Sequence, residues 1–296
     1  MKKILVFAMS VAIAMTSCES CILEENATSA KTAKVHVSMN GFEIETMTRT
    51  TTANDAGVSG IAFAVIDSEG EIVYSKQQAK GDTGFGSVSF ELTEGIYTFA
   101  AEAHIYSDVS SISVSGGKAI ATIDESAVYG TFAASKQVTV TAGEDVDLQM
   151  TLSRISAELS LETKDNQPED VKKLQIFVGD TLKPAYTSFS IDLATGTMAG
   201  FGTTGHLARE WSRSTSDAGK PTTQSCALLL ADEQQNLPVK IVVLGSDNTV
   251  LRSHSIASVP FKQNSKTIIT GALYATEGRS TFLFNTDWDD ETNGGW

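Results

Sequence analysis

The chain has 296 residues, a net charge of −14 and three cysteines. Its length is enough for two domains of ordinary size, and three cysteines are too few for a fold built on disulfides. An acidic balance this strong disfavours nucleic acid as a partner, because phosphate binding needs clustered lysine and arginine.

The first element along the chain is an export signal. Two lysines precede an apolar run over residues 4–15, which is too short to span a bilayer and is typical of a signal peptide. The run ends in Met15-Thr16-Ser17-Cys18, which looks like a bacterial lipobox. We therefore predict that residues 1–17 are removed and that Cys18 carries acyl chains such as palmitate. Because Met15 replaces the usual leucine, cleavage by signal peptidase I is the alternative.

Residues 18–33 form a polar tether between the lipid and the folded part. Removal of residues 1–17 takes away two lysines, which leaves 279 residues with a net charge of −16. Glutamates 19, 24 and 25 resemble acidic signals that send some lipoproteins to the cell surface. A solvated linker of the same composition is the alternative interpretation.

From residue 34 onward, apolar side chains recur with period two in short segments rich in β-branched and aromatic residues, which predicts strands. The first strand, residues 34–46, changes phase at Asn40-Gly41, as a β-bulge requires. A hairpin follows over residues 60–75 and turns at 67–70. Further strands are expected at residues 87–92, 96–104, 118–123, 129–132, 138–140, 146–152 and 155–161.

The rest of the chain continues this pattern. Residues 237–254 echo 60–76 as an apolar strand, an acidic turn and a second strand, which suggests two similar domains. Short helices are considered only at 207–212 and 168–173. We predict an all-β chain of two tandem antiparallel sandwich domains, residues 34–153 and 154–296. The remaining expected strands are 174–178, 188–193, 225–231, 239–244, 250–256, 267–274 and 281–285.

No catalytic constellation emerges, so we expect no enzyme, no cofactor and no metal. Residues 200–205 match G-x-G-x-x-G, but a dinucleotide site needs a βαβ unit and the surrounding pattern is antiparallel. The four histidines are widely spaced, and no G-x-S-x-G elbow occurs. The acidic residues of 287–291 lack the spacing of a calcium loop and are expected to be solvated.

The cysteines and one threonine leave alternatives open. Cys18 and Cys21 form a C-x-x-C pair, but lipidation would consume the Cys18 thiol. Cys21 and Cys226 either form a long-range disulfide or stay free, and Cys226 suits a buried apolar position. Thr181, in Asp-Thr-Leu, resembles an O-glycosylation sequon.

Several features follow one another in a recognisable order. Residues 48–50, Thr-Arg-Thr, come soon after the alternating first strand, and LTEGIYTF stands at 92–99. LSRISA at 152–157 falls at the predicted domain junction, VPFKQN follows at 259–264, and a closing strand precedes Asp287-Trp288. Together with the lipobox, these features resemble the fimbrillin superfamily of type V fimbriae, which includes shaft, tip and anchor lipoproteins.

The resemblance implies two transthyretin-like β-sandwich domains. In shaft subunits of this family an arginine-specific protease cuts after the first strand, and a strand from a neighbouring subunit fills the groove, which is donor-strand complementation. The candidate cleavage site is Arg49, although an arginine in an uncut surface loop is the alternative. The donor-strand and groove residues that would leave are Val35, Val37, Met39, Phe42 and Ile44.

The predicted function is a structural fimbrial subunit or fimbrial anchor lipoprotein that assembles by donor-strand exchange. Its partners would be other fimbrial subunits, the outer membrane through the lipid anchor, and receptors on host or bacterial surfaces. The expected location is the surface of the outer membrane, or the fimbrium once the chain is processed. A glycan-binding surface lipoprotein is the alternative, with Trp211, Arg209 and Arg213 as the candidate platform.

Overall fold

The computed structural model describes residues 31–43, 57–105, 111–124, 128, 130–179, 188–200, 208–275 and 283–285. In these ranges the chain forms strands and turns, with two short 3-10 turns at Thr215–Asp217 and Ser246–Asn248 as its helical segments. None of the described segments is a helix with the length and apolar character needed to cross a membrane. The prediction of an all-β chain with β-sandwich sheets is confirmed.

Nine of the described strands come from the first part of the chain, and seven of them form one sheet in the order β3-β2-β5-β8-β9-β1-β4. Strand β8 meets β9 only through two residue pairs at one end, so the sheet folds there into two layers. Apolar side chains from both layers, Phe63, Phe99, Val37 and Leu152 among them, form the first core. The strands are β1 (Ala33–Glu43), β2 (Gly60–Ile66), β3 (Ile72–Ala79), β4 (Ser87–Leu92), β5 (Gly95–His104), β6 (Ser111–Ser115), β7 (Lys118–Asp124), β8 (Thr131–Val140) and β9 (Val146–Arg154).

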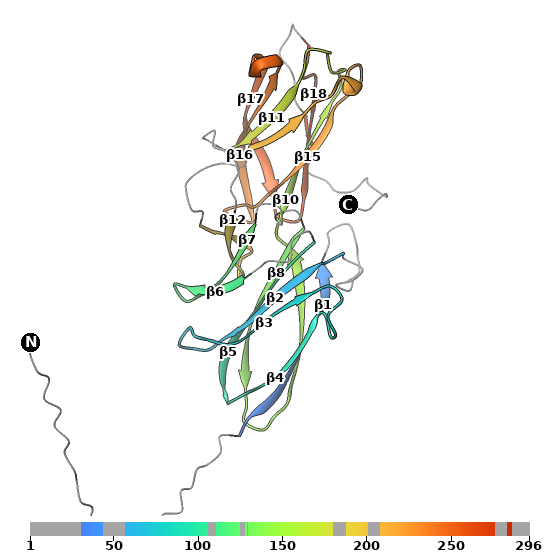
Figure 1. Cartoon of the computed structure of the whole chain (residues 1–296). Helices are drawn as coiled ribbons and strands as arrows, with labels where there is room; N and C mark the ends of the chain where they lie inside the picture. Colours follow the sequence, from blue (N-terminus) through green and yellow to red (C-terminus); the bar gives the residue numbers. More distant parts are fainter. Residues whose placement is uncertain are drawn as a thin grey trace, which may run out of the picture. The chain divides into compact units, whose positions relative to one another are not determined.

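The second part of the chain forms two four-stranded sheets, β14-β11-β16-β17 and β15-β10-β18-β19 (Figure 1). They enclose a second core that includes Leu159, Leu161, Ile241 and Phe261. The strands are β10 (Ala157–Thr163), β11 (Lys173–Val178), β12 (Ser188–Asp192), β13 (Thr197–Gly200), β14 (Ala208–Ser212), β15 (Thr223–Leu228), β16 (Gln234–Leu244), β17 (Val250–Lys262), β18 (Lys266–Gly271) and β19 (Leu283–Asn285).

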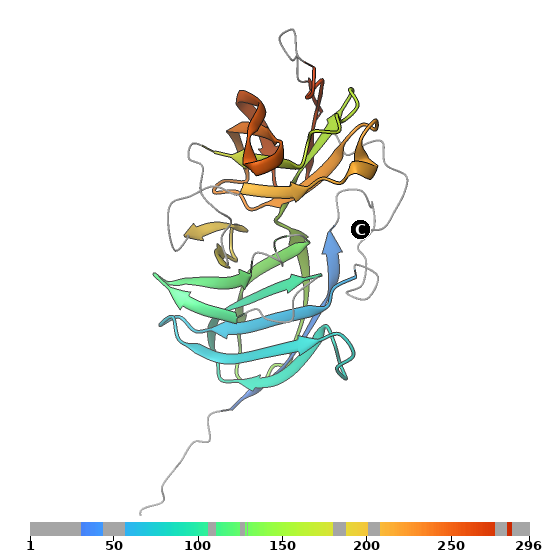
Figure 2. The same cartoon turned by 45° about the horizontal axis from the view of Figure 1, so that its top comes forward.

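One strand order occurs twice. In the first repeat (β1–β5, β8 and β9), β1 lies between β4 and β9, and the facing layer is β3-β2-β5-β8. In the second repeat (β10, β11 and β14–β18), β10 lies between β15 and β18, and the facing layer is β14-β11-β16-β17. In Figure 2 the first repeat is coloured blue to green and the second repeat yellow-green to red. The predicted domains 34–153 and 154–296 stay predictions, and this repetition supports them.

The repetition is not the one suggested by the sequence echo. Residues 60–76 lie in β2 and β3, whereas residues 237–254 lie in β16 and β17. By strand order, the counterparts of β16 and β17 are β5 and β8. The echo therefore reflects a shared hairpin design at two different places in the repeat.

Each repeat carries an inserted hairpin, and the two hairpins join. Strands β6 and β7 are inserted between β5 and β8, and β12 and β13 between β11 and β14, and together they form the sheet β13-β12-β7-β6. The Lys118 ammonium lies 2.6 Å from the buried Asp192 carboxylate across the β7–β12 ladder. A third apolar cluster, including Ile123, Ile155 and Ile191, packs here. The inserts thus couple the two repeats.

Most ladders are antiparallel, as expected, but β1–β9 and β10–β18 are parallel. The two short helices that were considered do not form. Residues 208–212 form strand β14, and residues 168–173 make a turn that leads into β11. Both segments are short, and pairing of β14 with β11 decides its conformation. Strands β6 and β13 were not predicted; they are short, at five and four residues, and lie at the two edges of their sheet.

Candidate functional site: the slot of the first strand

Strand β1 lies between β4 and β9, and we call this place the first-strand slot. Val37 pairs antiparallel with Val88 on β4 and parallel with Leu148 on β9. A central strand satisfies the backbone hydrogen bonds of both neighbours, so its loss would leave two open sheet edges. The pairing of β4 and β9 on this side therefore depends on a single segment, β1.

The inward face of β1 is part of the first core. Ala33, Val35, Val37 and Met39 are each at most 1% exposed. The placement of Val35, Val37 and Met39 on one buried face agrees with the predicted alternation. Phe42 lies on β1, but its side chain is outside the described part, and Ile44 and Arg49 also fall outside it. Their assigned roles in strand exchange stay predictions.

The predicted bulge is confirmed. Ser38 pairs with Gln149 and Gly41 with Thr151, so β1 advances by three residues while β9 advances by two. The extra residue changes which face later side chains occupy. This is the physical reason for the phase change read in the sequence.

A buried glutamine, which sequence reasoning did not select, holds one end of the slot. Gln78, which is 5% exposed, donates through its amide nitrogen to the Gly84 and Ser87 carbonyls at 2.9 and 3.0 Å. Its amide oxygen accepts a hydrogen bond from the Gly86 backbone N–H at 3.1 Å. The Gly86 carbonyl in turn accepts from the Met39 N–H at 2.7 Å. Gln78 therefore positions the β3–β4 loop against β1.

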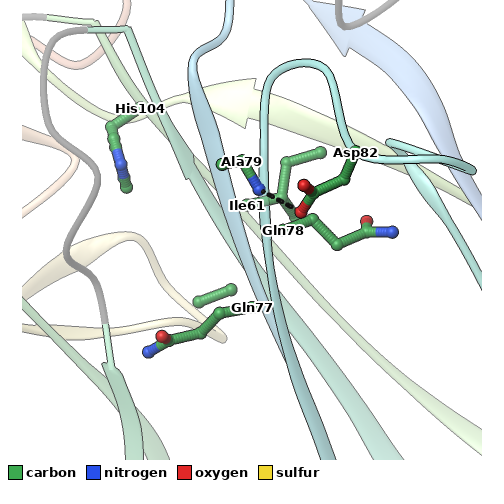
Figure 3. A pocket seen from close by; sticks show the side chains of 7 residues that line it. Ile61, Gln77, Gln78, Ala79, Asp82 and His104 are labelled. Carbon is green, nitrogen blue, oxygen red and sulfur yellow. Dashed lines mark hydrogen bonds between the residues drawn. The ribbon is translucent and has the colours of Figure 1, made fainter.

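A pocket of about 210 Å³ lies beside this loop, lined by residues of β2, β3 and β5 (Figure 3). Its polar groups have structural partners: the Asp82 carboxylate accepts from the Ala79 N–H at 2.9 Å, and His104 Nδ1 lies 3.2 Å from the buried Glu102 carboxylate. Among the described residues that line it there is neither a hydroxyl nor a thiol nucleophile.

The candidate glycan platform is not assembled as an open surface. Trp211 lies on β14 opposite Leu174 and packs against the second core. The Arg213 side chain is 7% exposed and donates to the Gln167 side chain at 2.6 Å and to Thr222 at 3.2 Å. With the ring against the core and this guanidinium engaged, stacking on a sugar has no support from this geometry.

Cys226 has the buried position expected for it. It lies on β15, is 8% exposed and is a free cysteine. Burial in the second core raises the pKa of the Cys226 thiol to about 12, so the thiol stays protonated at physiological pH. Cys18, Cys21, Thr181, the glycines from 201 to 205 and the acidic residues of 287–291 lie outside the described residues.

No cluster of three or more metal-ligating side chains occurs in the part of the chain that the structure describes. In the structure an extended strand, β1, occupies the first-strand slot and pairs with a neighbour on each side. Such an interaction uses backbone hydrogen bonds for affinity and alternate side-chain pockets for specificity.

Known proteins of similar fold were found among solved structures. The fimbrial anchor protein Mfa2 from Porphyromonas gingivalis superposes with a TM-score of 0.53 at 10% identity, covering 86% of this chain and 95% of that one. A candidate adhesin from Bacteroides ovatus gives 0.52 at 13% identity, covering 88% and 96%. At identities this low, these superpositions show a shared fold and nothing more. No curated protein matches by sequence, and residues 96–296 match the model of a family of unknown function, DUF6562.

Proposed function

This chain belongs to DUF6562, a family of unknown function, and we propose that it is a subunit or anchor of a cell-surface fimbria. The proposal rests on the first-strand slot, in which one strand lies between two neighbours and supplies part of the first core. The folds shared with a fimbrial anchor protein and a candidate adhesin support the same role. A structural role needs no catalytic group.

In the proposed assembly step, cleavage after Arg49 separates β1 from the rest of the chain. The emptied slot then exposes apolar core and two sheet edges, and a strand of another subunit fills it. Burial of each larger inward side chain contributes roughly 1.5–3 kcal/mol, so a donor with three of them forms a long-lived joint. The incoming strand would have to fill the core positions that Val35, Val37 and Met39 of β1 occupy.

Lipidation at Cys18 would hold an anchor, or an unprocessed subunit, on the outer membrane. The lipobox at residues 15–18 and the polar tether that follows support this location. In cells fed a labelled fatty acid, the wild-type chain should carry label and Cys18→Ser should carry none. Equal labelling of both would refute the anchor.

Strand exchange is tested by controlled cleavage of the chain from which residues 1–17 are absent. Brief trypsin treatment, with the new amino terminus identified as Thr50, should convert the protein into ladders that resist heating in detergent. Arg49→Ala should remain monomeric under the same treatment. A chain confirmed as cut at Arg49 that stays monomeric, even with an added peptide of residues 31–44, would rule out this mechanism.

A further inference from the structure

Strands β1 and β10, which occupy equivalent places in the two repeats, carry opposite charges at one matching position. Ala33 pairs with Leu92 on β4, and Ala157 pairs with Leu228 on β15, which aligns β1 with β10 residue by residue. The next position is Lys34 in β1 and Glu158 in β10. A lysine and a glutamate therefore occupy equivalent places in otherwise similar strands.

The neighbours of these two residues have the complementary charge. Lys34 is directly opposite Glu91 on β4, and its backbone N–H donates to the Asp145 carboxylate at 3.3 Å. Glu158 is directly opposite Lys266 on β18, with Nζ and Oε1 3.8 Å apart. Side chains directly opposite on adjacent strands interact, and like charges there are destabilising. The charges on the adjacent strands thus complement Lys34 in β1 and Glu158 in β10.

The next outward residue of β1 also has an acidic neighbour. His36 is directly opposite Asp147 on β9, and its Nδ1 lies 2.9 Å from the Ser89 hydroxyl on β4. Two residues further on, Ser38 faces the neutral Ser87 and Gln149. The acidic neighbours therefore gather around the start of β1, where the strand itself is basic.

We propose that this acidic rim, formed by Glu91, Asp145 and Asp147, selects the strand that enters the first-strand slot. The inference rests on the proposed function and specifies its partner: an extended segment of another subunit with basic side chains at the outward positions of Lys34 and His36. Its inward side chains would follow β1, a small residue, then two β-branched ones, then a long flexible one. A segment with glutamate at the first outward position, as in β10, would be disfavoured.

Charge is suited to this task because the rim is exposed. Complementary charges at a rim act mainly on the association rate and on rejection of wrong partners, and salt screens them. Apolar burial then holds whichever strand has entered.

The first test measures strand entry into the chain cut after Arg49. Three labelled peptides of residues 31–44 are compared: the native sequence, K34Q/H36Q and K34E/H36E. At low salt the glutamate peptide should enter on the order of 10-fold more slowly than the native one, and the difference should largely vanish at 1 M salt. Replacement of Glu91 and Asp147 by lysine should reverse the order. Equal entry rates at low salt would overturn the inference.

The second test uses the uncut chain, so that it does not depend on exchange. Lys34→Glu and Glu91→Lys should each lower the urea midpoint at low salt, and the double variant should recover most of the loss. Lys76→Glu, an exposed position on β3 outside the slot, is the control for charge alone. If none of the peptides enters the cut chain, the proposed function is refuted, and the double-variant comparison still tests the charge rule. If the double variant does not recover the loss, the charge rule itself is refuted.

Discussion

Strands β1 and β10 occupy equivalent places in the two repeats, between an antiparallel and a parallel neighbour. Residues 33–37 of β1 alternate between buried and exposed, whereas six of the seven residues of β10 are buried. Strand β10 follows β9 after only Ile155 and Ser156, both buried. Strand β1 is joined to β2 by residues 44–59, which contain Arg49. A single cut within residues 44–59 would detach β1 from the strands that follow it, whereas β10 is continuous with β9 before it and β11 after it.

The largest expected effect comes from a charge on the inward face of either strand. Val37→Glu places a carboxylate where the side chain is 0% exposed, and Leu161→Glu does the same at the equivalent position of β10. Each should cost about 3–5 kcal/mol, because a buried charge lacks a partner. Thr151→Glu, at an exposed position of β9, should cost little. Urea unfolding of all three checks this, and a mild effect of Val37→Glu would show that β1 is not part of the core.

The second prediction concerns the short connection that fixes β10. Gly196 has a φ of +67°, and a Cβ there would clash with Ile155 Cγ2. Gly196→Ala should destabilise by about 2–4 kcal/mol, from the left-handed backbone and the clash together. Gly219→Ala is a matched control, since its φ is +74° and nothing lies within 4 Å. Equal losses in thermal unfolding would mean that Ile155 yields freely and that the connection is less constrained than described.

The third prediction weakens the slot of β1 alone. Gln78→Ala removes three hydrogen bonds that hold the β3–β4 loop. The expected loss is about 2–3 kcal/mol, because buried backbone groups lose their partners. Ser75→Ala, at an exposed position of the same strand, serves as control. Hydrogen exchange should quicken at Met39, whose N–H bonds to this loop, and stay unchanged at Leu159; the reverse pattern would contradict the assignment.

The smallest effect is a dependence on pH that belongs to the second repeat. Cys226 lies opposite Leu159 of β10, and burial raises the pKa of its thiol from an ordinary value of 9.0 to about 12. Below pH 9 the thiol is protonated in both states; between pH 9 and 12 only the unfolded chain ionises, so stability falls as pH rises. From pH 8 to 10 the wild type should lose about 1–1.5 kcal/mol more than Cys226→Ala. Parallel pH profiles would show that the thiol is solvated.

The same cysteine distinguishes the repeats during exchange. If only β1 leaves after cleavage at Arg49, thiol reagents should modify Cys226 no faster in the cut chain than in the intact one, because β10 still covers it. The rate of labelling at pH 8 is the measurement. Rapid labelling after the cut would mean that the two repeats open together.

The period-two stripes were enough to place most strands, because a strand with one buried face must alternate whatever its partners are. The bulge at Gly41 and the buried Val35, Val37 and Met39 followed from that rule. So did the absence of long helices in the described residues. These features depend on local chemistry, which the sequence contains directly.

The tertiary structure alone decided which strands are neighbours. The parallel pairing of β1 with β9, the joining of two inserted hairpins and the strand conformation of residues 208–212 all depend on contacts between residues far apart along the chain. Gln78 and the acidic rim became visible for the same reason, since a side chain's hydrogen-bond partners and cross-strand neighbours exist only once the register is set. Local alternation determines that a segment is a strand; long-range packing determines the slot in which it lies.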